Sequence, residues 1–269
     1  MVHVRRWSPL VVLLVGVLLY AAVRQAALDT ENPKLLPSLM LLGAAVVPVA
    51  FVAWVAGRRL SFGVGSTTVV LTALIGGVVG TVTASVLEFD TRRDLGSLPL
   101  LGIGLIEEAA KLIAPLAVLL VVRPRHPADG LLVGVASGAG FAALETMGFA
   151  LVVLVQSRGD LGAVDEVLAL RGLTSPAAHM AWTGLTAAAL WYAGAHWRRA
   201  RAWAGLAVTY LAVAGLHALW DGTDRDVVRG VLAVVALTAL LLVTHQLATD
   251  DRRRQPSLMA PLVPAAGPR

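Results

Sequence analysis

Cysteine is absent from the 269 residues, and charged residues make up only 14% of them. The missing cysteine excludes disulfide bonds, a thiolate nucleophile and a cysteine-based metal site. The scarcity of charge comes with a hydrophobic share of 57% and a mean hydropathy of +0.77, a combination that soluble domains do not show. The sequence is therefore predicted to be an integral membrane protein that lies in the lipid bilayer.

Lysine is scarce as well, because Lys34 and Lys111 are the only two in the chain and arginine supplies the rest of the positive charge. A net charge of +5 would suggest nucleic-acid binding in a soluble protein, but no basic stripe is interleaved with aromatic residues here. The arginines fall instead at the ends of apolar runs, where the positive-inside rule accounts for them. We therefore expect no nucleic-acid partner.

The apolar runs predict an all-α fold, a polytopic bundle of about eight transmembrane helices, since each run approaches the roughly 20 residues that a spanning helix needs. The predicted spans are residues 8–27, 35–56, 66–87, 98–122, 130–155, 175–195, 202–220 and 227–247. Most basic residues then lie on the side of the N-terminus, which predicts that both termini are cytoplasmic. Residues 1–249 are expected to form a single bundle, and residues 250–269 a disordered cytoplasmic tail.

The span at residues 98–122 carries Glu107, Glu108 and Lys111 near its middle. Each ionisable side chain at bilayer depth costs about 2.5 to 3.5 kcal/mol on insertion scales, so three of them indicate a function. Lys111 follows Glu107 by four residues and Glu108 by three, a spacing at which a helical lysine reaches both acids. One carboxylate is left over for general acid–base chemistry. Pro115 predicts a bend in the helix just below the acids.

Three further ionisable residues fall on other predicted spans. Glu145 shares one helical face with Gly138 and Phe141, which directs it toward a neighbouring helix instead of lipid. His179 and His217 are expected one turn below the outer surface, whereas the other histidines lie at cytoplasmic ends. We therefore expect two imidazoles and up to three carboxylates to meet in the outer half of the membrane. Residues 156–174 are interpreted as an outer loop.

This combination of side chains is typical of a membrane-embedded hydrolase. Imidazole and carboxylate are suitable zinc ligands, and a catalytic zinc needs three protein ligands and an open position for water. A glutamate of the acidic pair would deprotonate that water, and Asp221 could orient the imidazole of His217. Two other classes stay open: a proton- or cation-coupled transporter that uses the buried glutamates as a relay, and a non-catalytic membrane partner protein.

Four features, in their order along the chain, resemble the PrsW family of intramembrane endopeptidases. Residues 107–111 (EEAAK) resemble its EExxK motif, residues 141–145 (FAALE) its FxxxE motif, and His179 and His217 its two single histidines. That family is similar in turn to the CAAX-processing and bacteriocin-processing (CPBP, or Abi-type) membrane proteases. The resemblance covers about residues 98–221, which would be the catalytic core.

The resemblance implies a protease of the bacterial inner membrane that cleaves a membrane-anchored protein, with an anti-sigma factor as the substrate of the family's best-known member. Glu107 and Glu108 would activate water as catalytic residues. Glu145, His179 and His217 would complete the catalytic site, either as ligands of a metal, for which zinc is the candidate, or as stabilisers of the oxyanion.

The chain departs from the pattern that we expect of the family at two positions. Where the family is expected to have a polar amide, this sequence has Thr146 after the FxxxE glutamate and Asp221 after the last histidine. The second difference bears on the chemistry, because a carboxylate beside His217 would orient and protonate the imidazole differently from an amide.

Overall fold

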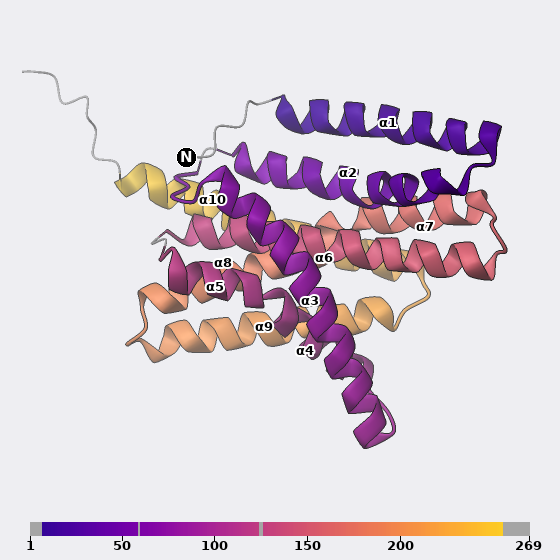
Figure 1. The fold of residues 1–269 in the computed structure, drawn as a ribbon. Coiled ribbons are helices and arrows are strands. Elements are labelled where there is room, and N and C mark those ends of the chain that lie inside the picture. The colour runs from indigo at the N-terminus through magenta and orange to yellow at the C-terminus, as the bar shows by residue number, and fades with distance from the viewer. Residues whose placement is uncertain (1–6, 59, 124–125, 255–269) are drawn as a thin grey trace, which may run out of the picture.

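The computed structural model describes residues 7–58, 60–123 and 126–254, with side chains described as far as Asp251. The described part of the chain is built from helices and contains no strand, which confirms the prediction of an all-α fold. The elements are α1 (Ser8–Thr30), η1 (Pro33–Leu35), α2 (Leu36–Ala56), α3 (Ser66–Leu95), α4 (Leu100–Lys111), α5 (Ile113–Val121), α6 (Pro127–Gln156), α7 (Leu161–Thr174), η2 (Pro176–Met180), α8 (Ala181–Ala195), α9 (Ala200–Asp221) and α10 (Asp226–Arg254). Most of them run side by side, and α3 crosses the bundle obliquely (Figure 1).

Six helical segments in the described residues are long and apolar enough to span a membrane: α1, η1 with α2, α3, α6, α9 and α10. The protein is therefore a multi-pass membrane protein. The other two predicted spans are interrupted, because residues 98–122 form α4 and α5 and residues 175–195 form η2 and α8. A count of eight spans and cytoplasmic termini stay predictions. Helix α10 continues through Arg254, so the predicted tail begins as helix, and residues 255–269 lie outside the described residues.

Helix α6 is the centre of the bundle and packs against α2, α3, α7 and α8. Its glycines let the neighbouring backbones come close, as is common in membrane helices. A Cβ added at Gly140 would clash with the carbonyl oxygen of Ala73 on α3, and one at Gly138 would lie 2.5 Å from that of His179. The small residues on α6 therefore allow η2, with His179, to lie directly against the helix that carries Glu145.

The break between α4 and α5 follows from Pro115. Proline has no N–H to donate to the carbonyl of Lys111, four residues earlier, and α4 ends at Lys111. The Ser137 hydroxyl of α6 donates to that free carbonyl at 2.7 Å. The predicted bend is confirmed, and the neighbouring helix satisfies the backbone group that the bend exposes, as an apolar environment requires.

The stretch interpreted as an outer loop, residues 156–174, is mostly helical, so that interpretation is wrong. Helix α7 lies beside α6 in Figure 1 and packs against both α6 and α2. It buries Val164, Leu168 and Gly172, which are four residues apart and form one helical face. Burial of this apolar face against the bundle stabilises the helix. The polar residues that suggested a loop lie on its other faces.

Candidate active site

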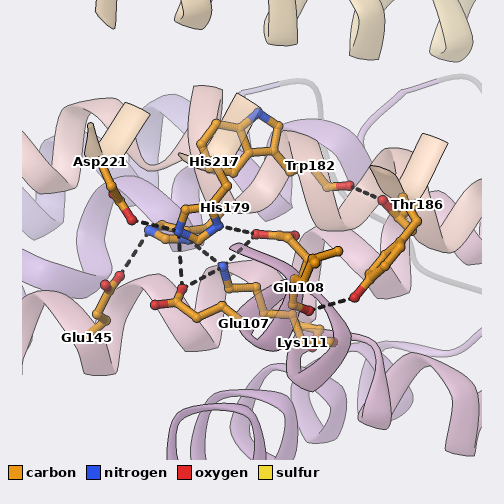
Figure 2. A network of polar contacts seen from close by, with 12 residues as sticks. Glu107, Glu108, Lys111, Glu145, His179, Trp182, Thr186, His217 and Asp221 are labelled. Atoms are coloured by element: carbon orange, nitrogen blue, oxygen red, sulfur yellow. Dashed lines mark hydrogen bonds and ion pairs between the residues drawn. The ribbon is translucent and has the colours of Figure 1, made fainter. Parts of the chain in front are cut away.

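The side chains predicted from separate spans meet in one cluster inside the bundle (Figure 2). Helix α4 carries Glu107, Glu108 and Lys111, α6 carries Glu145, η2 carries His179, and α9 carries His217. The cluster is shielded from solvent: Lys111 has no exposed surface, and Glu108 and His217 retain 1% and 2% of theirs. Five catalytic candidates and the lysine thus share one site.

Lys111 is the centre of this cluster. Its Nζ donates to Glu107 Oε2 at 3.1 Å and to Glu108 Oε1 at 2.7 Å, and it lies 2.9 Å from Nδ1 of His179. The ammonium also sits over the ring of Phe141, 4.3 Å from the centroid, in a cation–π contact. The helical spacing of the EExxK motif therefore brings one lysine to both acids, as expected.

The contact with Lys111 fixes the state of His179. An ammonium group only donates hydrogen bonds, so Nδ1 of His179 must accept and Nε2 carries the ring hydrogen. That Nε2 faces Oε2 of Glu145 at 3.0 Å. His179 is therefore held by Lys111 at one nitrogen and by Glu145 at the other.

His217 lies between carboxylates. Its Nδ1 is 2.8 Å from Glu108 Oε1, and its Nε2 is 3.2 Å from Asp221 Oδ2 and 3.5 Å from Glu107 Oε2. The indole of Trp182 packs on the imidazole with ring centroids 5.2 Å apart. Asp221, one helical turn after His217, is thus in contact with it, as the sequence suggested for an orienting residue.

A local irregularity of the backbone places His179. Residues Pro176–Met180 form a π-helical turn, and Ala178 departs from helical geometry with φ −99° and ψ −109°. Single π-turns occur frequently at functional sites, where they redirect a side chain. The turn separates α7 from α8 beside Gly138 of α6, whose missing side chain leaves room for it.

Arg171 of α7 completes the cluster and was missed by the sequence reading. Its Nη2 lies 2.7 Å from Glu145 Oε2, the same oxygen that contacts His179. Its guanidinium also stacks over Phe149, 4.0 Å from the ring centroid. The four-residue spacing of the apolar positions in α7 was the signal that could have revealed a helix here, and with it a half-buried arginine.

A cleft of about 630 Å³ opens beside the cluster. It is bounded by α6, α7, η2, the end of α9 and the start of α10. His179 and Asp221 line it together with polar and apolar side chains. The remaining residues of its lining are Thr146, Phe149, Val167, Leu170, Arg171, Thr174, Ser175, Ala178, Trp220, Asp226, Arg229, Gly230 and Ala233. A chain that lies in this cleft reaches the imidazole of His179.

The cluster lies level with the middle of α6, since Phe141, under Lys111, is near the centre of that 30-residue helix. Tyr210 supports it from α9, because its hydroxyl donates to the carbonyl of Leu105 at 2.6 Å and so ties α9 to α4 just before the acidic pair. The reactive groups are therefore built on long, mutually anchored helices.

The contacts of the cluster bear on whether it holds a metal ion. Among the described residues, no group of three or more His, Asp or Glu side chains is arranged to hold a metal ion. The nitrogens of His179 and His217 contact protein carboxylates or Lys111 instead, and the ammonium of Lys111 already supplies a cation to both acids. Glu145, His179 and His217 therefore do not form a metal-ligand set as they stand, although their chemical types suit zinc.

Comparison with known families supplies one match. Residues 31–246 match the family described as PrsW family intramembrane metalloprotease. The match is wider than residues 98–221, the part over which the sequence motifs were recognised. Comparison with curated proteins and with solved structures finds no match.

Proposed function

The chain belongs to the PrsW family of intramembrane metalloproteases, and on that premise we propose that it cleaves a membrane-anchored protein by glutamate-assisted attack of water. The protein is a hydrolase that acts within the membrane. The observation that carries the proposal is the linked cluster of two acids, two imidazoles and one ammonium, joined by contacts of 2.7 to 3.5 Å beside a cleft. Burying such a network in a bilayer costs free energy, and ionisable residues at this depth therefore usually mark a functional site.

Glu107 is the better placed of the two acids to act as the general base. Its side chain keeps 11% of its surface exposed, against 1% for that of Glu108. In Figure 2 its carboxylate lies at the end of the cluster where Glu145 and Asp221 also lie. Glu108 instead faces Lys111 and His217 with one oxygen, which suits a residue that holds the other groups in place.

In the proposed reaction, Glu107 takes a proton from water as the water oxygen bonds to the scissile carbonyl carbon. The carbonyl oxygen gains the negative charge, and the Nε2 groups of His179 and His217, which face Glu145 and Asp221 in this structure, are the donors that would turn to it. The carbon–nitrogen bond then breaks, and the proton held by Glu107 passes to the leaving amine. Glu145 and Asp221 act by keeping the two imidazoles oriented.

The cleft between α7 and α10 is the proposed binding place for the scissile segment, because His179 and Asp221 both line it. A membrane-anchored protein can present an extended segment there from within the bilayer. An anti-sigma factor is one substrate of this kind, and the bacterial inner membrane is the expected location. The scissile bond is expected to lie at a depth between the midplane and the outer surface of the membrane.

Zinc stays a prediction. The family description names a metal, while the present contacts of the imidazoles do not form a metal site. Metal analysis of purified protein and of a His179→Ala variant decides whether His179 is a ligand. We expect zinc, where it is bound, to fall in the variant. Equal zinc in both proteins, or full activity of a metal-free protein, would exclude a site that His179 ligates.

The function is tested by comparing membrane proteomes of cells that carry the wild-type protein and Glu107→Gln. A truncated substrate should be present in the first and replaced by its full-length form in the second. Glu166→Gln on the exposed side of α7 is the matched control, since it makes the same chemical change outside the site. Identical proteomes of wild type and Glu107→Gln would contradict the proposal and would favour a non-catalytic protein or a transporter.

A further inference from the structure

Helix α7 brings an arginine to the active site from outside the recognised motifs. Arg171 Nη2 lies 2.7 Å from Oε2 of Glu145, and that oxygen lies 3.0 Å from Nε2 of His179. One carboxylate oxygen thus joins a guanidinium to an imidazole. Both contacts are ion-pair distances between partly buried side chains, where opposite charges are screened less than at the surface.

The guanidinium of Arg171 also contacts an aromatic ring. Phe149 lies under it at 4.0 Å, and its Nε is buried without a hydrogen-bond partner among the described residues. Oε2 of Glu145 is likewise buried without a hydrogen-bond partner in the described part of the chain, so its contact with Arg171 is an ion pair that lacks the geometry of a hydrogen bond. The attraction between the two charges has to offset both unpaired groups.

The helix that carries Arg171 is also fixed at its other end. Asp165, six residues earlier on α7, accepts a hydrogen bond from the Tyr20 hydroxyl and forms an ion pair with Arg24, both on α1. Between these two points Leu168 of α7 packs against α2, where a Cβ added at Gly43 would lie 2.8 Å from it. Helix α7 therefore contacts α1 and α2 on one side and the active site, through Arg171, on the other.

We propose that Arg171 is a positioning residue for hydrolysis: it holds the Glu145 carboxylate so that Oε2 faces Nε2 of His179. Without it, Glu145 loses the cation at its Oε2 and is free to rotate away from His179. A rotated Glu145 would release the imidazole from one of its two anchors. This inference rests on the proposed function, because it assigns a role within the same site.

Two substitutions test the role of Arg171. Arg171→Gln removes the cation and should lower kcat by roughly 10- to 100-fold, the range that is usual when a group that orients an active-site residue is lost. KM for the substrate found by the proteome comparison should change little. Arg171→Lys keeps a cation and should recover part of the lost kcat. Activity of Arg171→Gln within twofold of wild type, or no recovery in Arg171→Lys, would overturn the proposal.

A double-mutant cycle separates positioning from general support of the fold. If Arg171 acts through Glu145, Arg171→Gln should have little further effect in a Glu145→Gln background. Additive losses would overturn the proposal. Asp165→Asn is the structural control, because it removes an ion pair from the same helix without touching Glu145. Equal losses of kcat in Asp165→Asn and Arg171→Gln would show that activity depends only on the position of α7 in the bundle, and would overturn the proposal.

Two further measurements separate this inference from the proposed function. Glu107→Gln is assayed beside the arginine variants: if it abolishes cleavage while Arg171→Gln cleaves within twofold of wild type, only the inference about Arg171 fails. The second measurement needs no substrate. The ¹⁵N imidazole signals of His179, assigned with His179→Ala, should move in Arg171→Gln and stay in place in Arg24→Gln. Unmoved signals in both variants would overturn the positioning role even if no cleavage were found.

Discussion

Two charged clusters in this protein use the same kinds of side chain in different surroundings. The cluster of Tyr20, Arg24 and Asp165 joins α1 to α7, and its arginine and aspartate side chains keep 38% and 23% of their surfaces exposed. The cluster around Lys111 joins α4, α6, η2 and α9, and Lys111 itself has no exposed surface. One cluster lies at the edge of the bundle and the other inside it.

The comparison shows how burial changes what an ion pair does. A partly exposed pair is screened, and losing one partner leaves a charge that water can solvate. A buried pair pays the full desolvation cost of both ions, and losing one partner leaves a charge with no solvent. We therefore interpret the cluster at the edge of the bundle, called the outer cluster below, as a connection between helices. The cluster around Lys111 is interpreted as the catalytic one.

The largest effect on stability is expected from Lys111→Met. The substitution leaves Glu107 and Glu108 buried beside each other without their shared cation, and breaking a buried ion pair costs about 3 to 5 kcal/mol. Thermal unfolding in detergent, followed by tryptophan fluorescence, measures the loss. Adding Glu108→Gln to Lys111→Met should recover part of the stability, because it removes one unpaired carboxylate. A Lys111→Met protein as stable as wild type would refute the contrast between the two clusters.

A smaller loss of stability is expected from Ser137→Ala, which removes a single buried hydrogen bond beside the cluster around Lys111. The variant leaves the carbonyl of Lys111 without a donor inside the bundle, at a cost of about 1 to 3 kcal/mol. Thr209→Ala is the matched control. Thr209 is half-buried, and its hydroxyl donates within its own helix to the carbonyl of Gly205 in an exposed hydrogen bond. The same unfolding measurement on both variants should show a loss only for Ser137→Ala, and equal losses would contradict this account of the α4–α5 break.

The smallest effect is expected at the outer cluster. Asp165→Asn should lower the melting temperature by much less than Lys111→Met, and it should leave substrate cleavage within about twofold of wild type, since exposed pairs contribute little. Melting curves and cleavage assays on the same preparations measure both. A loss of cleavage as large as that of Glu107→Gln would mean that the outer cluster also takes part in the reaction.

Much of the fold and the family could be predicted from the sequence. Long apolar runs with few charges predict membrane helices from composition alone, and the prediction of helices in a multi-pass protein is confirmed. The EExxK spacing predicts a lysine that reaches two acids on its own helix, and the structure has this contact. The resemblance to the PrsW family is confirmed by the match over residues 31–246.

The contribution of α7 could not be predicted in the same way. Its polar residues suggested a loop, because an amphipathic helix of 14 residues is too short to be recognised as a membrane span. Arg171 was then missed, since an arginine in an outer loop is expected to face water. The partners of His179 were hidden for a related reason: they depend on the π-turn at Ala178, which no local pattern predicted.

The sequence by itself determined the membrane class, the helical periodicity and the residue types of the site, because all of these depend on neighbours within one helix. The tertiary structure alone decided which nitrogen of each histidine faces which carboxylate, and that Arg171 reaches Glu145 and Ser137 reaches the carbonyl of Lys111. Those contacts join residues on different helices, and their geometry depends on how closely the backbones pack. In this protein that packing depends on the glycines of α6.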